Sequence, residues 1–573
     1  MVKYFLLYFY LILIISSILG YGFLLAQFLN KNLLKYNLGY IGILGLLALV
    51  ILSYTTIFFI KHSYHHNLIV HAIGLISFAF FFFKLKLNKD YILLIILIFL
   101  LSSSLFILKN HDDFSYYHLT YSLGLTENKI QLGLGNIGHG PRHHSSVFYL
   151  NSLIFLPYIK FYLFHSIGLI TLTFVNFICL GFILDKKEFK SFDHAYIFYL
   201  LVFTYINVKF YRISEYGTDI AAQLIVLILI PLSLLAIRKK ISKFEFESNI
   251  QLLILLICYV ITVKPYFVVY SLFLFLFLIL FYKKNYFIKL FFLSRTTIIA
   301  AFTFVLFSLV NLSYTGCIVY PLKETCFSQK IPWSLSQKEV QKMKVWFELW
   351  SKGGASPPHR VEKRKEYKEY IEGFNWLKGW TDTYFFNKGL ENLLSILFLS
   401  VLFIIIFYRN KKKFPESFNK NIYKVLFVIL ILFSEWFYKH PTLRYGGYSL
   451  LASLVFLPTS LFLSNSPINK KTKKKIVATL VITSLLIFNA RNIKRIDKEI
   501  KVYNSSSFPF FYVPKGDSEL ISLDENIKVY FHKNIDACWA TKTPCVGGSG
   551  DLNLKVKKIL GFNVFLAKNK KLK

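Results

Sequence analysis

The sequence predicts an all-α polytopic membrane protein of about 12–14 transmembrane helices, with extracytoplasmic loops and a small C-terminal α/β soluble domain. Two observations predict this class. Of the 573 residues, 55% are hydrophobic and 18% aromatic, and the mean hydropathy is +0.51. Apolar runs of roughly 17–22 residues also recur along the chain, and each is long enough to cross a hydrocarbon core of about 30 Å.

About fourteen such runs can be separated. The first lacks a small-residue cleavage site, so it predicts a span and not a signal peptide. The stretch 147–184 is long enough to hold an interfacial helix before its span. The predicted spans are 4–27, 39–60, 67–83, 91–108, 147–184, 193–210, 218–237, 249–263, 266–282, 294–312, 389–408, 422–438, 446–464 and 476–489.

Basic residues in the short connections orient these spans, because Lys and Arg mark the cytoplasmic side. The basic connections alternate with poorly basic or long ones from the fourth span onward. The basic set is 84–89, 185–190, 238–243, 283–295, 409–413 and 470–475. The outer set is therefore 109–146, 211–217, the Lys264-Pro265 turn, 313–388 and 439–445.

The formal charge of +37 follows from this anchoring and from attraction to anionic membrane lipids. No basic soluble domain with aromatic platforms is visible, so nucleic acid is not predicted as a partner.

The soluble stretches divide the chain into five parts. N-terminal transmembrane helices (1–90) precede a transmembrane core (91–312) that contains the first outer loop, 109–146. An outer loop domain (313–388) and further transmembrane helices (389–489) follow. The last part, 490–573, is the predicted small domain, in which the alternating residues 527–531 indicate a strand.

Four of the six cysteines form two closely spaced pairs in segments assigned to the outside. Cys317 with Cys326, and Cys538 with Cys545, each enclose a turn that contains proline. Disulfides persist in oxidising compartments, and neither pair has a CxxC spacing or the histidine neighbours of a zinc centre. The sequence therefore predicts two disulfides, with free or metal-binding thiols as the alternative.

The first outer loop begins with two adjacent carboxylates, Asp112 and Asp113, directly after an apolar run. Tyr116 follows Asp112 at a spacing that places both on one helix face. A carboxylate at the water-facing end of a membrane helix can act as a general base. Two carboxylates together can hold a divalent cation such as Mg or Mn beside a phosphate. The alternative is a helix cap with solvated acids.

Other charged residues recur on the same predicted face. Asp219 starts a span as either a functional acid or a helix-dipole acid. Nearby Arg212 and Glu215 can pair with each other. The cations that could bind a phosphate group are Arg142, His143, Lys264 and Arg444, with interfacial anchoring as the alternative for each. A histidine group near another outer loop (His62, His65, His66 and His71) suits interfacial placement better than metal binding, and no metal site is predicted.

This layout resembles the GT-C superfamily of polytopic glycosyltransferases, especially the bacterial lipid A aminoarabinose transferase and protein O-mannosyltransferase branch. The similarity covers residues 91–310. The similarity rests on the acidic pair Asp112-Asp113 with the following Tyr116, the segment 140–149 (GPRHHSSVFY), Arg212, Asp219 and Lys264. Three preceding spans, Tyr320-Pro321, Arg444-Tyr445 and the C-terminal cysteine pair depart from the family and indicate a distinct bacterial subfamily.

The resemblance implies a transferase in a bacterial inner membrane with its active face in the periplasm. The donor would be a polyprenyl-phosphate sugar and the acceptor a glycan or lipid. Asp112 would be the general base, assisted by Asp113, and the donor phosphate would contact Arg142, His143, Lys264 or Arg444. The residues that would shape the substrate site are Tyr116, His144, Arg212, Glu215, Asp219 and Tyr445.

Two other classes remain open at this point. A transporter or flippase of a lipid-linked glycan should carry ionisable residues inside its spans, for which Glu435 is the main candidate. A non-enzymatic envelope assembly protein would use its outer loops as docking surfaces.

Overall fold

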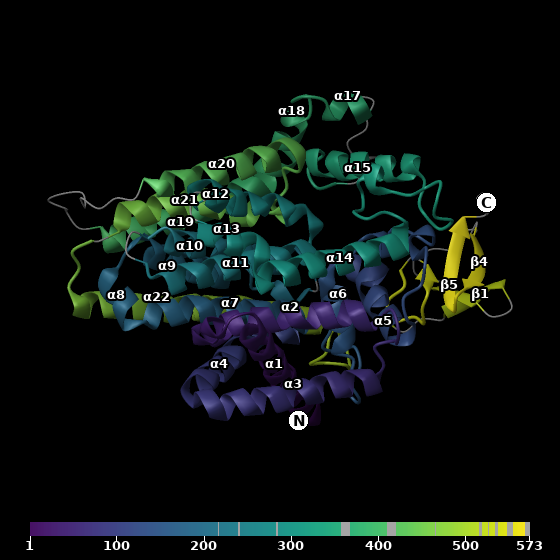
Figure 1. Cartoon of the computed structure of the whole chain (residues 1–573), viewed down its shortest axis with the longest axis horizontal. Helices are drawn as coiled ribbons and strands as arrows, with labels where there is room; N and C mark the ends of the chain where they lie inside the picture. The colour runs from purple at the N-terminus through teal and green to yellow at the C-terminus, as the bar shows by residue number, and fades with distance from the viewer. Residues whose placement is uncertain are drawn as a thin grey trace.

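The chain is mostly helical, with a small group of strands near its C-terminus (Figure 1). The computed structural model describes residues 1–215, 217–238, 241–281, 285–356, 367–408, 420–464, 466–514, 518–524, 527–532, 537–546 and 554–567. Among these residues, eleven helices are long and apolar enough to cross a membrane, by length and composition. The prediction of a helical membrane protein is confirmed, and each of the fourteen predicted ranges contains a helix.

The N-terminal helices are α1 (Val2–Leu29), α2 (Leu38–Thr56), α3 (Tyr64–Leu85) and α4 (Asn88–Leu101). Glycines allow the first three to approach closely. A Cβ at Gly20 in α1 would lie 1.9 Å from the carbonyl oxygen of Gly74 in α3, and one at Gly45 in α2 would lie 1.9 Å from that of Ile18 in α1. Small residues of this kind are typical of contacts between membrane helices, because they let backbones meet.

The helix α2 joins this group to the rest of the bundle. Its Gly39 and Gly42 pack against Phe174 of α7 (Ser166–Leu184), and its Tyr54 hydroxyl lies 3.0 Å from Nε2 of His144. In contrast, α3 lies along one side of the molecule (Figure 1), and most of its residues are not buried against other helices. The first two helices therefore belong to the same packed body as the helices that follow.

The helices of the core and of the later membrane segments lie approximately along the long axis of the molecule (Figure 1). They are α9 (His194–Lys209), α10 (Asp219–Ala236), α11 (Lys243–Val263), α12 (Leu272–Phe281), α14 (Arg295–Thr315), α19 (Leu390–Phe407), α20 (Asn421–Lys439), α21 (Gly447–Leu463) and α22 (Lys470–Tyr503). Polar caps begin several of them. Ser242 and Glu245 form a reciprocal capping box at the start of α11, for example.

Shorter helices fill the connections between them. They are α5 (Leu119–Glu127), α6 (Ser146–Leu153), α8 (Lys186–Ser191), α13 (Asn285–Leu293), α15 (Gln337–Lys352), α17 (Tyr367–Ile371) and α18 (Leu377–Trp380). The helix α6 precedes α7, as the length of 147–184 predicted, and α15 contains the amphipathic run of the loop domain.

Two predicted boundaries fall inside continuous helices. The segment Leu377–Phe407 is helical throughout, so the boundary at 388 lies within it. The helix α22 continues to Tyr503, beyond the boundary at 489. In both places a helix continues beyond its apolar run through polar and charged residues, and the hydropathy pattern marks only the apolar part of such a helix.

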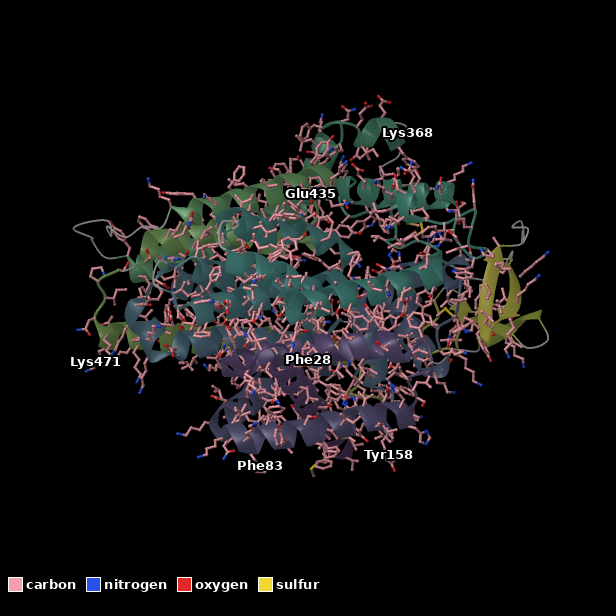
Figure 2. The ribbon with its side chains drawn as sticks, viewed as in Figure 1. Phe28, Phe83, Tyr158, Lys368, Glu435 and Lys471 are labelled. Carbon is pink, nitrogen blue, oxygen red and sulfur yellow. A yellow bond between two sulfur atoms is a disulfide. The ribbon has the colours of Figure 1, made fainter. Side chains whose placement is uncertain are left out.

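Three of the basic connections, 185–190, 238–243 and 470–475, meet at one end of the bundle. Arg238 pairs with Glu188 of α8 at 2.7 Å and with Asp193 at 2.6 Å, and the Lys473 ammonium donates to the carbonyl of Phe189. Figure 2 shows Lys471 at this end and Lys368 of α17 at the far side of the molecule. The basic segment 409–413 lies outside the described residues, as do parts of 238–243 and 283–295.

The C-terminal strands form two small sheets. In the first, β1 (Ser518–Asp524) pairs antiparallel with β2 (Ile527–His532), which pairs parallel with β3 (Cys545–Val546). In the second, β4 (Leu554–Ile559) pairs antiparallel with β5 (Phe562–Ala567). The strand predicted at 527–531 is confirmed as β2.

This C-terminal part packs onto the first outer loop. Leu132 and the β5 backbone exchange hydrogen bonds, from Leu132 N–H to the Asn563 carbonyl at 2.9 Å and from Phe565 N–H to the Leu132 carbonyl at 2.8 Å. Ile137 of the loop shares a small core with Val529 and Phe565. The two segments therefore form one unit at this end of the molecule.

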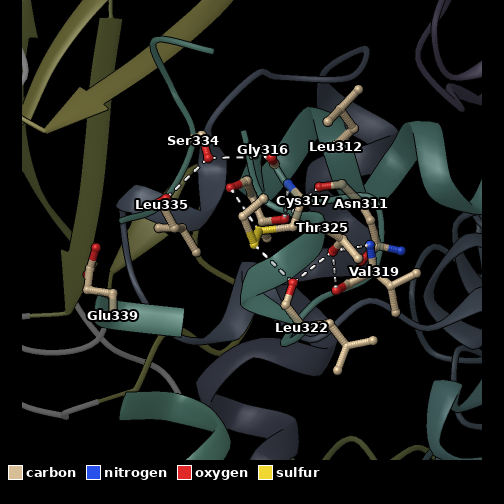
Figure 3. The surroundings of a disulfide bond; sticks show 12 residues. Asn311, Leu312, Gly316, Cys317, Val319, Leu322, Thr325, Ser334, Leu335 and Glu339 are labelled. Carbon is tan, nitrogen blue, oxygen red and sulfur yellow. Dashed lines mark hydrogen bonds between the residues drawn. A yellow bond between two sulfur atoms is a disulfide. The ribbon is translucent and has the colours of Figure 1, made fainter. Parts of the chain in front are cut away.

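Both predicted disulfides are present, Cys317–Cys326 and Cys538–Cys545. Figure 3 shows the first, at the turn after α14. Within this turn the Thr325 hydroxyl donates to the carbonyl of Leu322 at 2.8 Å and accepts from the N–H of Val319 at 3.1 Å. Cys179 and Cys258 are buried free thiols in helices.

Candidate functional site

Four charged side chains from distant segments form one ion cluster, which consists of Asp113, Asp219, Lys264 and Arg444. The Lys264 ammonium lies 2.6 Å from Oδ1 of Asp219, and Nε of Arg444 donates to Oδ2 of the same carboxylate. Nη2 of the Arg444 guanidinium donates to Oδ2 of Asp113 at 2.6 Å. Arg444 is thus shared by two carboxylates, and Asp219 by two cations.

Each member lies at the end of a helix or in a turn beside one. Asp219 is the first residue of α10, Lys264 directly follows α11, and Asp113 precedes the π-helical turn Phe114–His118. Arg444 lies in the turn between α20 and α21. The Gln223 side chain holds this turn by donating to the carbonyls of Leu443 and Arg444, each at 3.1 Å.

The cluster is partly open to solvent. The side chain of Asp219 is 5% exposed, whereas those of Lys264, Arg444 and Asp113 are 23%, 28% and 30% exposed. The two cations and one carboxylate can therefore be reached by a ligand, while Asp219 lies beneath them and holds both cations in place.

The charge of Asp113 is fixed by its partners. Burial alone would raise its pKa, but the Arg444 guanidinium, with smaller contributions from His111 and His118, lowers the pKa to about 2. Burial and Arg444 in turn lower the pKa of His111. Nδ1 of His111 accepts the N–H of Asp113 at 3.1 Å, as expected of a neutral imidazole. Asp113 is therefore ionised, and Arg444 is its main counterion.

Aromatic rings surround the cluster. The Lys264 ammonium lies 5.4 Å from the ring centre of Tyr445, and the Arg444 guanidinium lies 5.8 Å from that of Trp350 in α15. The ring of His143 packs 5.3 Å from that of Tyr117, and burial followed by the charge of Lys264 lowers the pKa of His143 to about 3. His143 is therefore neutral, and its ring packs beside the cluster without adding a charge.

A second charged group braces the first outer loop beside the cluster. Arg212 pairs with Glu215 at 2.6 Å, and Arg495 of α22 pairs with Glu215 and with Glu499, each at 2.5 Å. Glu499 also accepts the backbone N–H of Leu108 at 2.8 Å. The pairing of Arg212 with Glu215 was one of the two roles considered from the sequence, and the contacts make this group a support for the loop.

The remaining predicted residues lie outside the cluster. Asp112 and Tyr116 are exposed, and within the described part of the chain the Asp112 carboxylate makes no hydrogen bond or ion pair. Arg142 is buried, with Nε donating to the Gly135 carbonyl at 2.7 Å and the guanidinium 3.2 Å from Glu339. His144 lies within hydrogen-bonding distance of Tyr54 and Tyr121 in the interior.

Two of the histidines and Glu435 also have local partners. Nδ1 of His62 lies 2.6 Å from the Ser152 hydroxyl, and that of His66 lies 2.9 Å from Asn67. Tyr266 donates to the Glu435 carboxylate at 2.7 Å. Across the described ranges, no group of three or more His, Cys, Asp or Glu side chains is arranged to hold a metal ion.

Sequence reasoning missed several residues of the site. His111, Tyr117 and Trp350 surround the cluster, and Arg495 with Glu499 brace it from a helix that was assigned to a separate segment. His111 adjoins the acidic pair and could have been included on that basis. No local signal connects Trp350 or Arg495 with residues so distant in the chain.

The fold and the site define a polytopic helical membrane protein with a charged cluster at one end of its bundle. The chain belongs to the family described as a domain of unknown function, DUF8201, whose model matches residues 1–451. No curated protein and no solved structure matches the chain. All four cluster residues fall within the matched range, whereas α22 and the strands lie beyond it.

Proposed function

We propose that the protein is an integral membrane glycosyltransferase that moves a sugar from a polyprenyl-phosphate donor to a glycan or lipid acceptor of the cell envelope. The reaction takes place on the extracytoplasmic face of a bacterial inner membrane. The observation that supports this most is the cluster of Asp113, Asp219, Lys264 and Arg444, at the opposite end of the bundle from the basic connections. It combines cations for a phosphate with a carboxylate for an acceptor.

Lys264 and Arg444 bind the donor phosphate in this proposal. Arg444 offers a planar fork that suits phosphate oxygens, and Lys264 adds a compact charge beside it. Both are partly exposed and are held by the buried Asp219. The lipid tail of the donor stays in the bilayer, so the phosphate arrives at the helix ends where the two cations lie.

Donor binding also changes the state of Asp113. In the free protein Arg444 holds the pKa of Asp113 at about 2, which makes this carboxylate a weak base. A phosphate that binds Arg444 competes with Asp113 for the guanidinium, and loss of the counterion raises the pKa of Asp113. The carboxylate thus becomes a stronger base when the donor is in place.

The contacts favour Asp113 over Asp112 as the general base, because a base must lie within hydrogen-bonding reach of the proton that it removes. Asp113 accepts the acceptor hydroxyl proton as the hydroxyl oxygen attacks the anomeric carbon of the donor. The bond from that carbon to the phosphate oxygen breaks, and polyprenyl phosphate leaves with its charge held by Lys264 and Arg444. Asp112 remains on the solvent side of the loop.

A divalent cation does not fit the cluster as it is built. Its two carboxylates already share Arg444, and Asp219 also binds Lys264. Mg or Mn would have to displace one of these cations, so we derive no step through a metal.

The test is glycan and glycolipid profiling of cells that carry the wild type, a deletion, Asp113→Asn or Asp112→Asn. We expect the deletion to lose one sugar modification and Asp113→Asn to reduce the same modification by about 10²–10⁴-fold, the usual contribution of a general base. Asp112→Asn is the matched control and should retain it. The amount of each variant in the membrane fraction is measured in parallel.

A normal profile from well-expressed Asp113→Asn would contradict the assignment of the base. If the double variant Asp113→Asn/Asp112→Asn is also normal while the deletion is not, transport of a lipid-linked glycan becomes the better account. Glu435 would then be the first residue to test, since its carboxyl lies in a candidate membrane span and contacts Tyr266.

A further inference from the structure

A cavity of about 420 Å³ lies beside the ion cluster, between α5, the loop 131–141 and the C-terminal segment. Its volume is in the range of small-molecule sites in proteins. One wall comes from Thr543 to Val546, which belong to or adjoin the turn closed by the Cys538–Cys545 disulfide. The cavity is therefore built by two parts of the chain that are far apart in sequence.

The lining is aromatic and polar but carries little charge. Four tyrosines contribute to it, Tyr116, Tyr117, Tyr121 and Tyr314. Of the described residues that line it, none is Asp or Glu, and the basic ones are Lys129 and His139. The Lys129 ammonium already lies 4.3 Å from the ring centre of Phe562, and burial with the charge of Arg142 lowers the pKa of His139. This lining suits an uncharged ligand.

Gln131 and Tyr117 are polar side chains at the cavity whose polar groups have no hydrogen-bond partner within the described part of the chain. Gln131 is only 7% exposed, yet its side-chain amide makes no hydrogen bond there. The Tyr117 hydroxyl makes none either. Gln131 thus offers both a donor and an acceptor to a bound molecule.

Tyr117 connects the cavity with the ion cluster. Its ring lines the cavity, and its hydroxyl is close enough to Asp113, Arg444 and Asp219 that their charges shift its pKa, which burial raises first and most strongly. Tyr117 also belongs to the π-helical turn Phe114–His118 that Asp113 directly precedes, so a ligand that extends past Tyr117 approaches the start of this turn.

We infer that this cavity binds a neutral saccharide of one or two rings, the acceptor of the transfer. Tyrosine rings cover the apolar faces of a sugar, and neutral groups such as Gln131, Thr120 and Asn128 bond to its hydroxyls. The identification of the ligand as an acceptor rests on the proposed function, whereas saccharide binding can be measured without any transfer.

The C-terminal segment completes this site. The Thr543 hydroxyl donates to Glu127 of α5 at 2.6 Å, its N–H donates to the same carboxylate at 2.8 Å, and the Asn128 amide donates to Thr543 at 3.3 Å. These contacts hold the disulfide-closed turn against α5. The segment lies beyond the range that the family model matches, and in this proposal it forms one wall of the acceptor site.

Gly138 provides a clean test of the cavity. It lines the cavity, and a Cβ added there meets no atom within 4 Å. The natural cysteines are buried or disulfide-bonded, so a Gly138→Cys thiol would be the reactive one. We would measure the rate of maleimide labelling of the full-length variant in detergent, with and without glucose, N-acetylglucosamine, maltose or diacetylchitobiose at millimolar concentration. Glucose 6-phosphate is included as an anionic comparison.

We expect at least one neutral saccharide to slow the labelling of Gly138→Cys several-fold. Labelling of Lys501→Cys, an exposed position in α22, should not change. No protection by any neutral saccharide, or protection by glucose 6-phosphate alone, would overturn the inference. Gly138→Phe, whose ring would enter the cavity, should abolish sugar transfer in cells.

The outcomes for the cavity and for the proposed function can be told apart. If saccharides protect Gly138→Cys but the deletion changes no glycan, the binding site stands and the transferase proposal fails. If the deletion and Asp113→Asn lose a sugar while Gly138→Phe transfers normally, the transferase stands and the acceptor binds elsewhere.

Discussion

The Arg444 guanidinium donates a 2.6 Å hydrogen bond to Asp113, a residue 331 positions earlier in the chain. The same guanidinium also donates to Asp219, so that it ties the turn after α20 to both the first outer loop and the start of α10. Within the family-matched range, these contacts join an early and a late segment. The cluster is therefore a structural junction as well as a candidate site.

Replacing Arg444 should separate these two roles. Arg444→Ala leaves Asp113 without its main counterion and Asp219 with Lys264 alone, and we expect a loss of about 3 kcal/mol in the free energy of unfolding. Arg444→Lys keeps the charge but cannot reach both carboxylates, so it should lose less stability and still fail to transfer sugar. Thermal unfolding of the purified variants measures the first effect, and the glycan profile measures the second.

An exposed ion pair serves as the control for this comparison. Lys501 lies 2.9 Å from Asp497 in α22, and both side chains are more than two-thirds exposed. Lys501→Ala should change the stability by about 1 kcal/mol or less. If Arg444→Ala lowers the stability no more than Lys501→Ala does, the ion cluster does not stabilise the contact between these segments.

His143 should make stability depend on pH. Burial, with the charge of Lys264, lowers its pKa to about 3 from the ordinary value of 6.5. Between these two values the unfolded chain binds a proton at His143 and the folded protein does not, so this residue makes stability rise with pH. The contribution of neutral His143 to the free energy of unfolding is present above about pH 6.5, and it is lost as the pH falls from about 6.5 towards 3. We expect the unfolding temperature of the wild type to fall on acidification and that of His143→Phe to fall less.

Other buried histidines contribute to the same slope, so the difference between the two proteins is the quantity to measure. His65 is exposed, and His65→Phe is therefore the matched control. A pH profile of His143→Phe parallel to that of the wild type would show that His143 is not buried as a neutral group.

Much of the fold could be predicted from the sequence because local patterns determine it. Apolar length predicted the helices, the alternation at 527–531 predicted β2, and cysteine spacing predicted both disulfides. The pattern was less informative at helix ends. There, charged extensions such as the last turns of α22 continue a helix after the apolar run stops.

The partners of the charged residues could not be predicted in this way. Asp219, Lys264 and Arg444 were all selected as candidates, but nothing in their local sequence shows that they share one cluster. Arg142 was selected on equal grounds and instead pairs with Glu339, because the outer loop domain folds against the first loop. Charge and topology limited the candidate residues to one end of the bundle. Only the tertiary contacts show which of these residues belong to the ion cluster.

The two ends of the bundle should lie on opposite sides of the membrane. Lys471 belongs to a basic connection, and Lys368 lies in the loop domain at the far side of the molecule (Figure 2). Both side chains are exposed. In intact cells we expect an impermeant maleimide to label Lys368→Cys and to leave Lys471→Cys unlabelled until the cells are lysed. Labelling in the reverse order would invert the assigned orientation and remove the cluster from the extracytoplasmic face.

The glycine contacts among α1, α2 and α3 should be intolerant of even one methyl group. A Cβ at Gly20 or Gly45 would lie 1.9 Å from a carbonyl oxygen of the neighbouring helix, so the backbones would have to move apart. We expect Gly20→Ala and Gly45→Ala each to lower the free energy of unfolding by about 1–3 kcal/mol, the usual cost of overpacking. Gly138→Ala, whose Cβ would meet open space, should be close to neutral. Equal thermal stability of all three variants would show that α1 does not pack against α2 and α3 as described. Because α2 also contacts α7 through Gly39 and Gly42, loosening of this group should reduce the proposed sugar transfer as well as stability.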